Sequence, residues 1–116
     1  MTIYGISQSS GVERRLQIEP GARGVVLIVL DHVGGKERAR ILVPADPLLA
    51  SIIEPTPGGT PVEGVFPPHG PNLTLNVEVR RNEVLLSVTA AAGDGTDVAV
   101  GLDDFQDALE GILSRG

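Results

Sequence analysis

The sequence predicts a single α+β domain over residues 1–116: an antiparallel β-sheet of six to eight strands, curved or split into two sheets, packed with a short middle helix and a C-terminal amphipathic helix. Two observations predict it. Apolar and polar residues alternate along several short segments, which is typical of half-buried strands. Two other segments repeat apolar residues every three or four positions, as amphipathic helices do. The length suffices for one core.

Four strands are predicted in the first part of the chain, at residues 3–7, 12–18, 25–30 and 38–43. The second of them alternates cleanly, except that Arg14 interrupts its apolar face. The third is continuously apolar and rich in β-branched residues, which predicts a central strand covered on both faces. The Gly34-Gly35 pair after it predicts a hairpin into the fourth strand.

A short helix should follow, because Asp46 is a good N-cap and Pro47 suits the first helical position. Glu54-Pro55 ends it. Residues 54–71 hold six of the nine prolines, so we expect a long surface connection there. One edge strand at 62–66 is the only element that it could contain.

The last part of the chain predicts a three-stranded meander over 73–80, 84–90 and 98–100. A helix follows, with Asp103 as N-cap and Gln106 completing a capping box. Four strands and a helix would then occur twice, a ββββα duplication seen in the order of elements and not in the residues. That order is similar to the order in the whirly-type single-stranded-DNA-binding fold, which implies nucleic-acid binding.

Composition excludes several classes of protein. The net charge of −6 and pI near 4.7 disfavour a nucleic-acid binder with a wholly basic surface. The lack of cysteine excludes disulfides and thiol chemistry. No segment is apolar for long enough to span a bilayer, and the start MTIYGISQSS lacks signal-peptide features. We therefore expect a soluble, cytoplasmic, acidic protein without a membrane partner.

Chemical motifs are scarce. The sequence contains no nucleotide-binding glycine loop, no nucleophile elbow and no metal-ligand spacing, so we predict no cofactor, no metal and no enzymatic activity. A metal-dependent enzyme built on Asp31, His32 and His69 is the weakest hypothesis, because nothing in their spacing brings them together. Whether His32 and His69 share a site stays open.

The basic residues of the first half support one binding hypothesis. Five of them could form a basic face for a phosphate backbone: Arg14, Arg15, Lys36, Arg38 and Arg40. A single-stranded nucleic acid is therefore the alternative partner. The scarcity of aromatic residues weighs against it, because single-strand binders stack bases on aromatic rings.

The preferred hypothesis is a protein-interaction or assembly domain that forms a homo-oligomer. It is motivated by apolar residues that could be exposed, in the helix at 47–53 and at Val62, Val65 and Phe66. The partner would be another protein or a second copy of the chain.

Overall fold

The computed structural model describes residues 2–7, 11–21, 24–32, 38–66, 70–90 and 95–114. Four strands and a helix follow one another twice. The first half contains β1 (Thr2–Ile6), β2 (Glu13–Pro20), β3 (Val25–His32), β4 (Arg38–Pro44) and α1 (Ala45–Ile53). The second half contains β5 (Thr60–Val65), β6 (Asn72–Arg80), β7 (Glu83–Ala90), β8 (Gly95–Gly101) and α2 (Leu102–Leu113).

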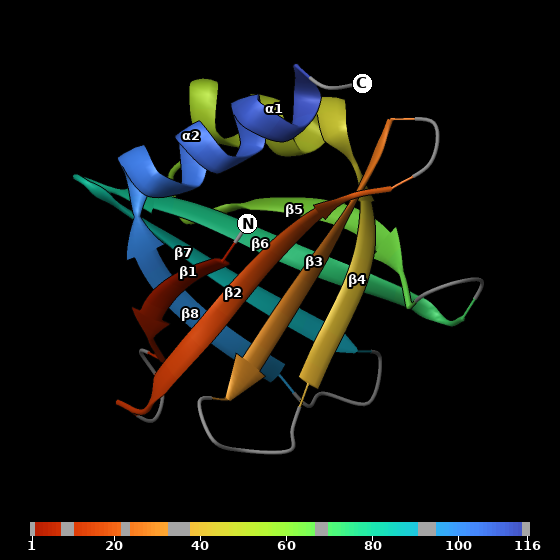
Figure 1. Ribbon diagram of the computed structural model, residues 1–116, viewed down its shortest axis with the longest axis horizontal. Helices are drawn as coiled ribbons and strands as arrows, with labels where there is room; N and C mark the ends of the chain where they lie inside the picture. Colours follow the sequence, from red (N-terminus) through yellow and green to blue (C-terminus); the bar gives the residue numbers. More distant parts are fainter. Residues whose placement is uncertain are drawn as a thin grey trace.

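Each strand pairs antiparallel with the next, and β8 returns to β1, so the eight strands close into a barrel. The predicted antiparallel sheet with two helices is confirmed, whereas its closure into a barrel is not part of the prediction. The strands of the first half run across those of the second, and both helices lie across one end of the barrel (Figure 1). β2 begins and β3 ends at the opposite end (Figure 1), which we call the loop end.

Alternation along the strands builds the core. Every second residue faces the inside of the barrel, and paired strands bring these residues together in rungs. One rung of the first half joins Ile18, Ile28 and Ile41, all fully buried. The corresponding rung of the second half joins Val77, Leu86 and Val98.

The two halves correspond position by position. The pairing registers align Ile41 with Val98 and Ile3 with Val62, and the same offsets hold along all four strands. We call residues that share a place in the two halves equivalent. The sequences give little sign of this repeat, since most equivalent residues differ and only their apolar pattern is kept.

The halves meet at two seams, each with a single registered pair. Leu42 of β4 pairs with Val65 of β5, and Ala99 of β8 pairs with Ile6 of β1. At both seams, the residue before the paired residue of β1 or β5 is a glycine, Gly5 or Gly64. A Cβ on Gly5 would lie 2.8 Å from the side chains of Val98 and Val100, and a Cβ on Gly64 would lie 2.7 Å from the side chain of Ile41. The seams therefore close only because these two positions lack a side chain.

Both helices begin in the same way, and not at the predicted N-caps. The backbone N–H of Ala45 donates to the carbonyl of Gly24 over 2.8 Å, and that of Leu102 donates to Asn82 over 2.7 Å. The N-caps are Pro44 and Gly101, without side-chain hydrogen bonds. The prediction that Asp46 and Asp103 are N-caps is wrong, because the preceding hairpins already bind the first N–H groups.

Gln106 also departs from the predicted capping box. Its side-chain amide donates instead to Glu110, one turn further along α2, over 3.3 Å. Asp46 and Asp103 remain in the first turns of their helices, where negative charge is favourable.

The helices seal one end of the barrel. Leu48, Ser51 and Ile52 of α1 are buried, as are the equivalent Phe105, Ala108 and Leu109 of α2. α1 contacts β5 and β6 of the second half as well as β4, while α2 contacts β2 of the first half as well as β7 and β8. Each helix therefore packs in large part on the half to which it does not belong.

The strand that the sequence allowed at 62–66 is present as β5, Thr60–Val65, which pairs with β6 over its whole length. It is not an edge strand, because Val65 also pairs with Leu42 of β4. The prediction for β3 needs correction. β3 is not covered on both faces by other layers. Its inner face fills the barrel, but on its outer face Leu27 is only half-buried, and Val29 is buried beside its pairing neighbours Gln17 and Arg40.

Candidate functional site

The first candidate site is an apolar area on the outside of the β8–β1 seam. Tyr4 and Ile6 point outward from β1 and are 62% and 54% exposed. Ala99 lies beside Ile6, and Leu85 lies beside Ala99, both partly exposed on the same outer face. We call Tyr4, Ile6, Leu85 and Ala99 the seam patch. Exposed apolar residues that are contiguous mark contact surfaces more often than isolated ones do.

Opposite charges border the seam patch on β2. Glu13 pairs with Ile6 and Arg15 pairs with Tyr4, so one acid and one base stand side by side along the patch. A shallow hollow beside it is lined by Tyr4, Gly5, Ile6, Gly11 and Glu13. The hollow is open to solvent, and its volume is about 390 Å³.

The other seam has an equivalent apolar row without the aromatic ring. Val65, Leu42 and Leu27 occupy the places of Ile6, Ala99 and Leu85, and all three are partly buried. Glu63 stands in the place of Tyr4 and is exposed. The two seams thus share their architecture, but only the β8–β1 seam presents two large, strongly exposed apolar side chains.

The sequence predicted exposure at other positions, with mixed results. Phe66 and Ile53 are exposed, at 43% and 61%. Val62 is buried in the barrel, and so are Leu48 and Ile52 of the 47–53 helix, so these residues do not contribute to a contact surface. The sequence did contain a signal for the seam patch, because Tyr4 and Ile6 are apolar at the positions of β1 that alternate with buried Ile3.

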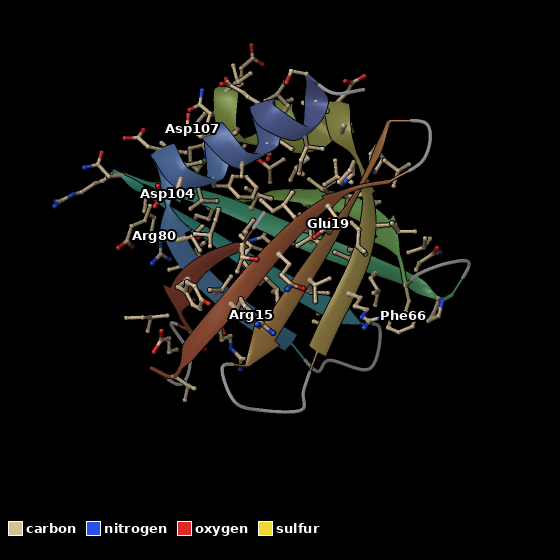
Figure 2. The ribbon with its side chains drawn as sticks, in the orientation of Figure 1. Arg15, Glu19, Phe66, Arg80, Asp104 and Asp107 are labelled. Atoms are coloured by element: carbon tan, nitrogen blue, oxygen red, sulfur yellow. The ribbon has the colours of Figure 1, made fainter. Side chains whose placement is uncertain are left out.

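The predicted basic face is only partly assembled. Arg15 and Arg40 lie on the outer face of the first half, on neighbouring rungs. Figure 2 shows Arg15 near the loop end of β2 and Glu19 near the helix end. Arg38 pairs in register with Asp31, and its side chain lies outside the described structure, as does all of Lys36.

Acidic residues interrupt this face. Glu13 and Glu19 flank Arg15 on the outer side of β2, and Asp31 stands opposite Arg15 in the register. The equivalents of Arg15 and Arg40 in the second half are Thr74 and Asp97. At these two outer places, cations therefore occur in the first half only, and there they alternate with carboxylates.

Arg14 does not belong to the outer face. It shares the inner side of β2 with Leu16 and Ile18, both fully buried. Its Nε and Nη1 atoms are buried, and within the described residues neither has a hydrogen-bond partner. Arg14 and Arg15 thus point to opposite sides of the barrel wall and cannot contact the same flat surface.

The histidine hypothesis lies largely outside the described residues. His32 pairs in register with Arg14, but the side chains of His32 and Asp31 are not described, and neither is His69. Among the residues that the structure describes, no three His, Asp or Glu side chains form a group that could hold a metal ion.

Two other polar contacts are structural. The hydroxyl of Ser7, which is fully buried, donates to Asp97 over 2.8 Å and ties the end of β1 to β8. At the exposed end of β6, Arg80 forms an ion pair with Glu78. The hydrogen bond and the charge of Glu78 raise the pKa of Arg80 above its ordinary value. Such an exposed pair adds little to stability.

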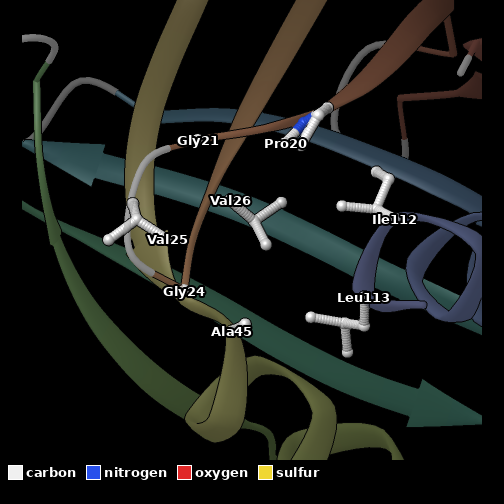
Figure 3. Close-up of a pocket in the computed structure, with 8 residues that line it drawn as sticks. All are labelled: Pro20, Gly21, Gly24, Val25, Val26, Ala45, Ile112 and Leu113. Carbon is white, nitrogen blue, oxygen red and sulfur yellow. The ribbon is translucent and has the colours of Figure 1, made fainter. Parts of the chain in front are cut away.

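A second, apolar pocket lies at the helix end. Ile112 and Leu113 project from α2 toward Val26 and Ala45, and Pro20, Gly21 and Gly24 line the other side (Figure 3). None of the described residues that line it is charged, so those residues offer no group that would orient a polar ligand.

No known protein family, curated protein or solved structure matches this chain. None of the described helices is long and apolar enough to cross a bilayer. A function for this protein is therefore inferred from its own surface.

Proposed function

We propose that this protein is a non-enzymatic assembly domain that self-associates through the seam patch. The observation that carries the proposal is the exposure of Tyr4 and Ile6 on consecutive outward positions of β1. Aromatic side chains are enriched at protein interfaces, where they bury a large area at a low entropic cost. The equivalent Glu63 supports the same conclusion, because it indicates that the barrel itself does not need an aromatic ring there.

The charges beside the seam patch favour a second copy of the chain as the partner. In a twofold interface, the same patch is used by both subunits. A twofold axis running across the strands would place Glu13 of one copy opposite Arg15 of the other. One acid and one base beside an apolar pair therefore make the patch complementary to itself.

Sedimentation equilibrium of the wild-type chain and of Tyr4→Glu tests this proposal. We expect the wild type to exceed its 12.1 kDa monomer mass as its concentration rises, and Tyr4→Glu to remain a monomer. Glutamate should be tolerated structurally, since it occurs naturally at the equivalent position 63. A wild type that stays monomeric at every concentration would exclude self-association through this patch.

Asn72→Glu is the matched control. Asn72 is exposed at the opposite seam and is equivalent to Glu13, so the substitution adds the same charge at a position where the fold accepts it. We expect its association to equal that of the wild type. Dissociation of both variants would point to net charge rather than to the patch.

Single-stranded nucleic acid is the second candidate partner, and one observation favours it. The exposed ring of Tyr4 stands beside Arg15 in the register, an arrangement that could stack a base and contact a phosphate. An NMR titration with a short mixed-sequence single strand tests it. Shifts that centre on Arg15 and Arg40, fade with salt and vanish in Arg40→Glu would support this candidate. Self-association should be unchanged in Arg40→Glu.

A further inference from the structure

One inward position carries a charge in the first half and an apolar residue in the second. Arg14 and Leu73 are equivalent, since each pairs with the seam glycine of its own half, Gly5 or Gly64. Leu73 is buried among the apolar residues of the barrel. The fold therefore accepts leucine at this place, and packing alone does not account for an arginine.

Among the described residues around Arg14, none accepts a hydrogen bond from its buried nitrogens. Two of its three guanidinium nitrogens, Nε and Nη1, are buried without a hydrogen-bond partner in the described part of the chain. An arginine cannot lose its proton in a protein. Two buried guanidinium nitrogens without an acceptor are unfavourable, so a native arginine in this position indicates an acceptor that the described residues do not supply. Carboxylate and phosphate oxygens are the acceptors that match a guanidinium best.

The position of Arg14 allows a small anion to reach it. It is the second residue of β2, and β2 begins at the loop end, away from the two helices (Figure 1). Its side chain is half-buried, so solvent reaches part of it. Gly5, its neighbour on β1, adds no side chain that would cover the guanidinium.

We propose that Arg14 anchors an oxyanion-binding site at the loop end of the barrel, which takes the carboxylate or phosphate group of a small-molecule ligand. The site is independent of the seam patch, because Arg14 points into the barrel and the patch lies on its outer face. Self-association and anion binding can therefore succeed or fail separately.

The direct test is a titration of the arginine Nε–H resonances by NMR, with sodium phosphate and sodium acetate as probes at constant ionic strength. We expect the Arg14 resonance to move saturably with one of the two salts, and the salt that acts at the lower concentration assigns the class of ligand. Arg81, exposed in the β6–β7 turn, is the internal reference for non-specific binding. No saturable movement with either salt, or equal movement of Arg81, overturns the proposal.

Thermal unfolding of three variants completes the test. At saturating probe, the melting temperature of the wild type should rise by about 5 °C, while that of Arg14→Leu should not change. Without the probe, Arg14→Leu should melt at a higher temperature than the wild type. The leucine, as at the equivalent position 73, leaves no buried nitrogen without an acceptor. Arg14→Gln provides a polar replacement should the leucine variant fold poorly, and it should also lose the response. Arg81→Asn removes one positive charge elsewhere, and its melting temperature should still rise with the probe. A response retained in both Arg14 variants overturns the proposal.

Discussion

β1 and β5 occupy the same place in the two halves, and their sequences TIYGI and TPVEGV keep the inward apolar residue and the seam glycine in register. They differ at the outward position, where Tyr4 corresponds to Glu63. The strands that follow differ at Arg14 and Leu73. What the halves share is what a closed barrel requires, and these two differences mark side chains that the barrel does not require. An internal repeat thus serves as a built-in control for separating structural from functional residues.

Truncating a buried side chain under either helix tests whether both helices seal the barrel, and it should cost the most stability. Phe105→Ala should lower the free energy of unfolding by about 3–5 kcal/mol, because it opens a cavity under α2. The equivalent Leu48→Ala should cost about 2–5 kcal/mol for the same reason. Urea denaturation followed by circular dichroism measures both. If Leu48→Ala left the stability unchanged, α1 would not be docked as described here.

At the loop end, the two halves can be made alike by moving the charge of Arg14 to its equivalent position. Leu73→Arg places in the second half the residue that the first half carries, without a ligand to accompany it. We expect a loss of about 3 kcal/mol, since a buried charge would lack a partner. Chemical denaturation measures the loss of stability in Leu73→Arg, and the conservative variant Leu73→Met serves as its control. A neutral result for the arginine variant would mean that this rung is open to water.

The seam glycines should respond alike if the seams are equivalent. Gly5→Ala and Gly64→Ala each force a methyl group against the backbone of the neighbouring strand, at the carbonyls of Ala99 and Leu42. We expect each to lose about 2 kcal/mol of stability. Gly111→Ala, in α2 with open space around it, is the control and should not destabilise. Unequal losses would show that one seam is the weaker.

The smallest effect concerns the two turns at the helix end. Arg81 has a φ of +53°, whereas Gly24 takes a positive φ in the equivalent turn. Arg81→Gly should therefore stabilise the protein by about 0.5 kcal/mol, since glycine adopts this conformation without strain. Thermal melting compares it with Arg80→Gly, a strand position where glycine should destabilise. A loss of stability in Arg81→Gly would indicate that its side chain has a role of its own.

Most of the elements could be predicted from the sequence, because alternation and helical periodicity depend on neighbours along the chain. The closure of the barrel could not, since each seam rests on one registered pair and on a glycine whose neighbours are distant in sequence. The N-caps were misplaced for the same reason: the groups that bind the helix starts, Gly24 and Asn82, belong to other elements. Long-range contacts of this kind leave no local pattern.

The candidate sites show the same difference between local sequence patterns and long-range contacts. The sequence singles out Arg14 as an interruption of an apolar face. Arg14 was nevertheless grouped with Arg15, because both lie on a predicted strand next to the one that carries Lys36, Arg38 and Arg40. The structure separates Arg14 from Arg15 across the barrel wall. For Tyr4 and Ile6, the sequence gives the alternation with Ile3, and the register adds that Ile3 is on the inner face.

The way each helix packs on the opposite half has a consequence for the integrity of the chain. Only the connection 54–59, largely exposed, joins the two halves covalently. Either half alone would leave part of the apolar side of its helix uncovered. The halves are thus complementary fragments, and a chain cleaved within this connection should persist as a non-covalent pair. Halves expressed separately should find each other, which makes this barrel a natural candidate for a split reporter.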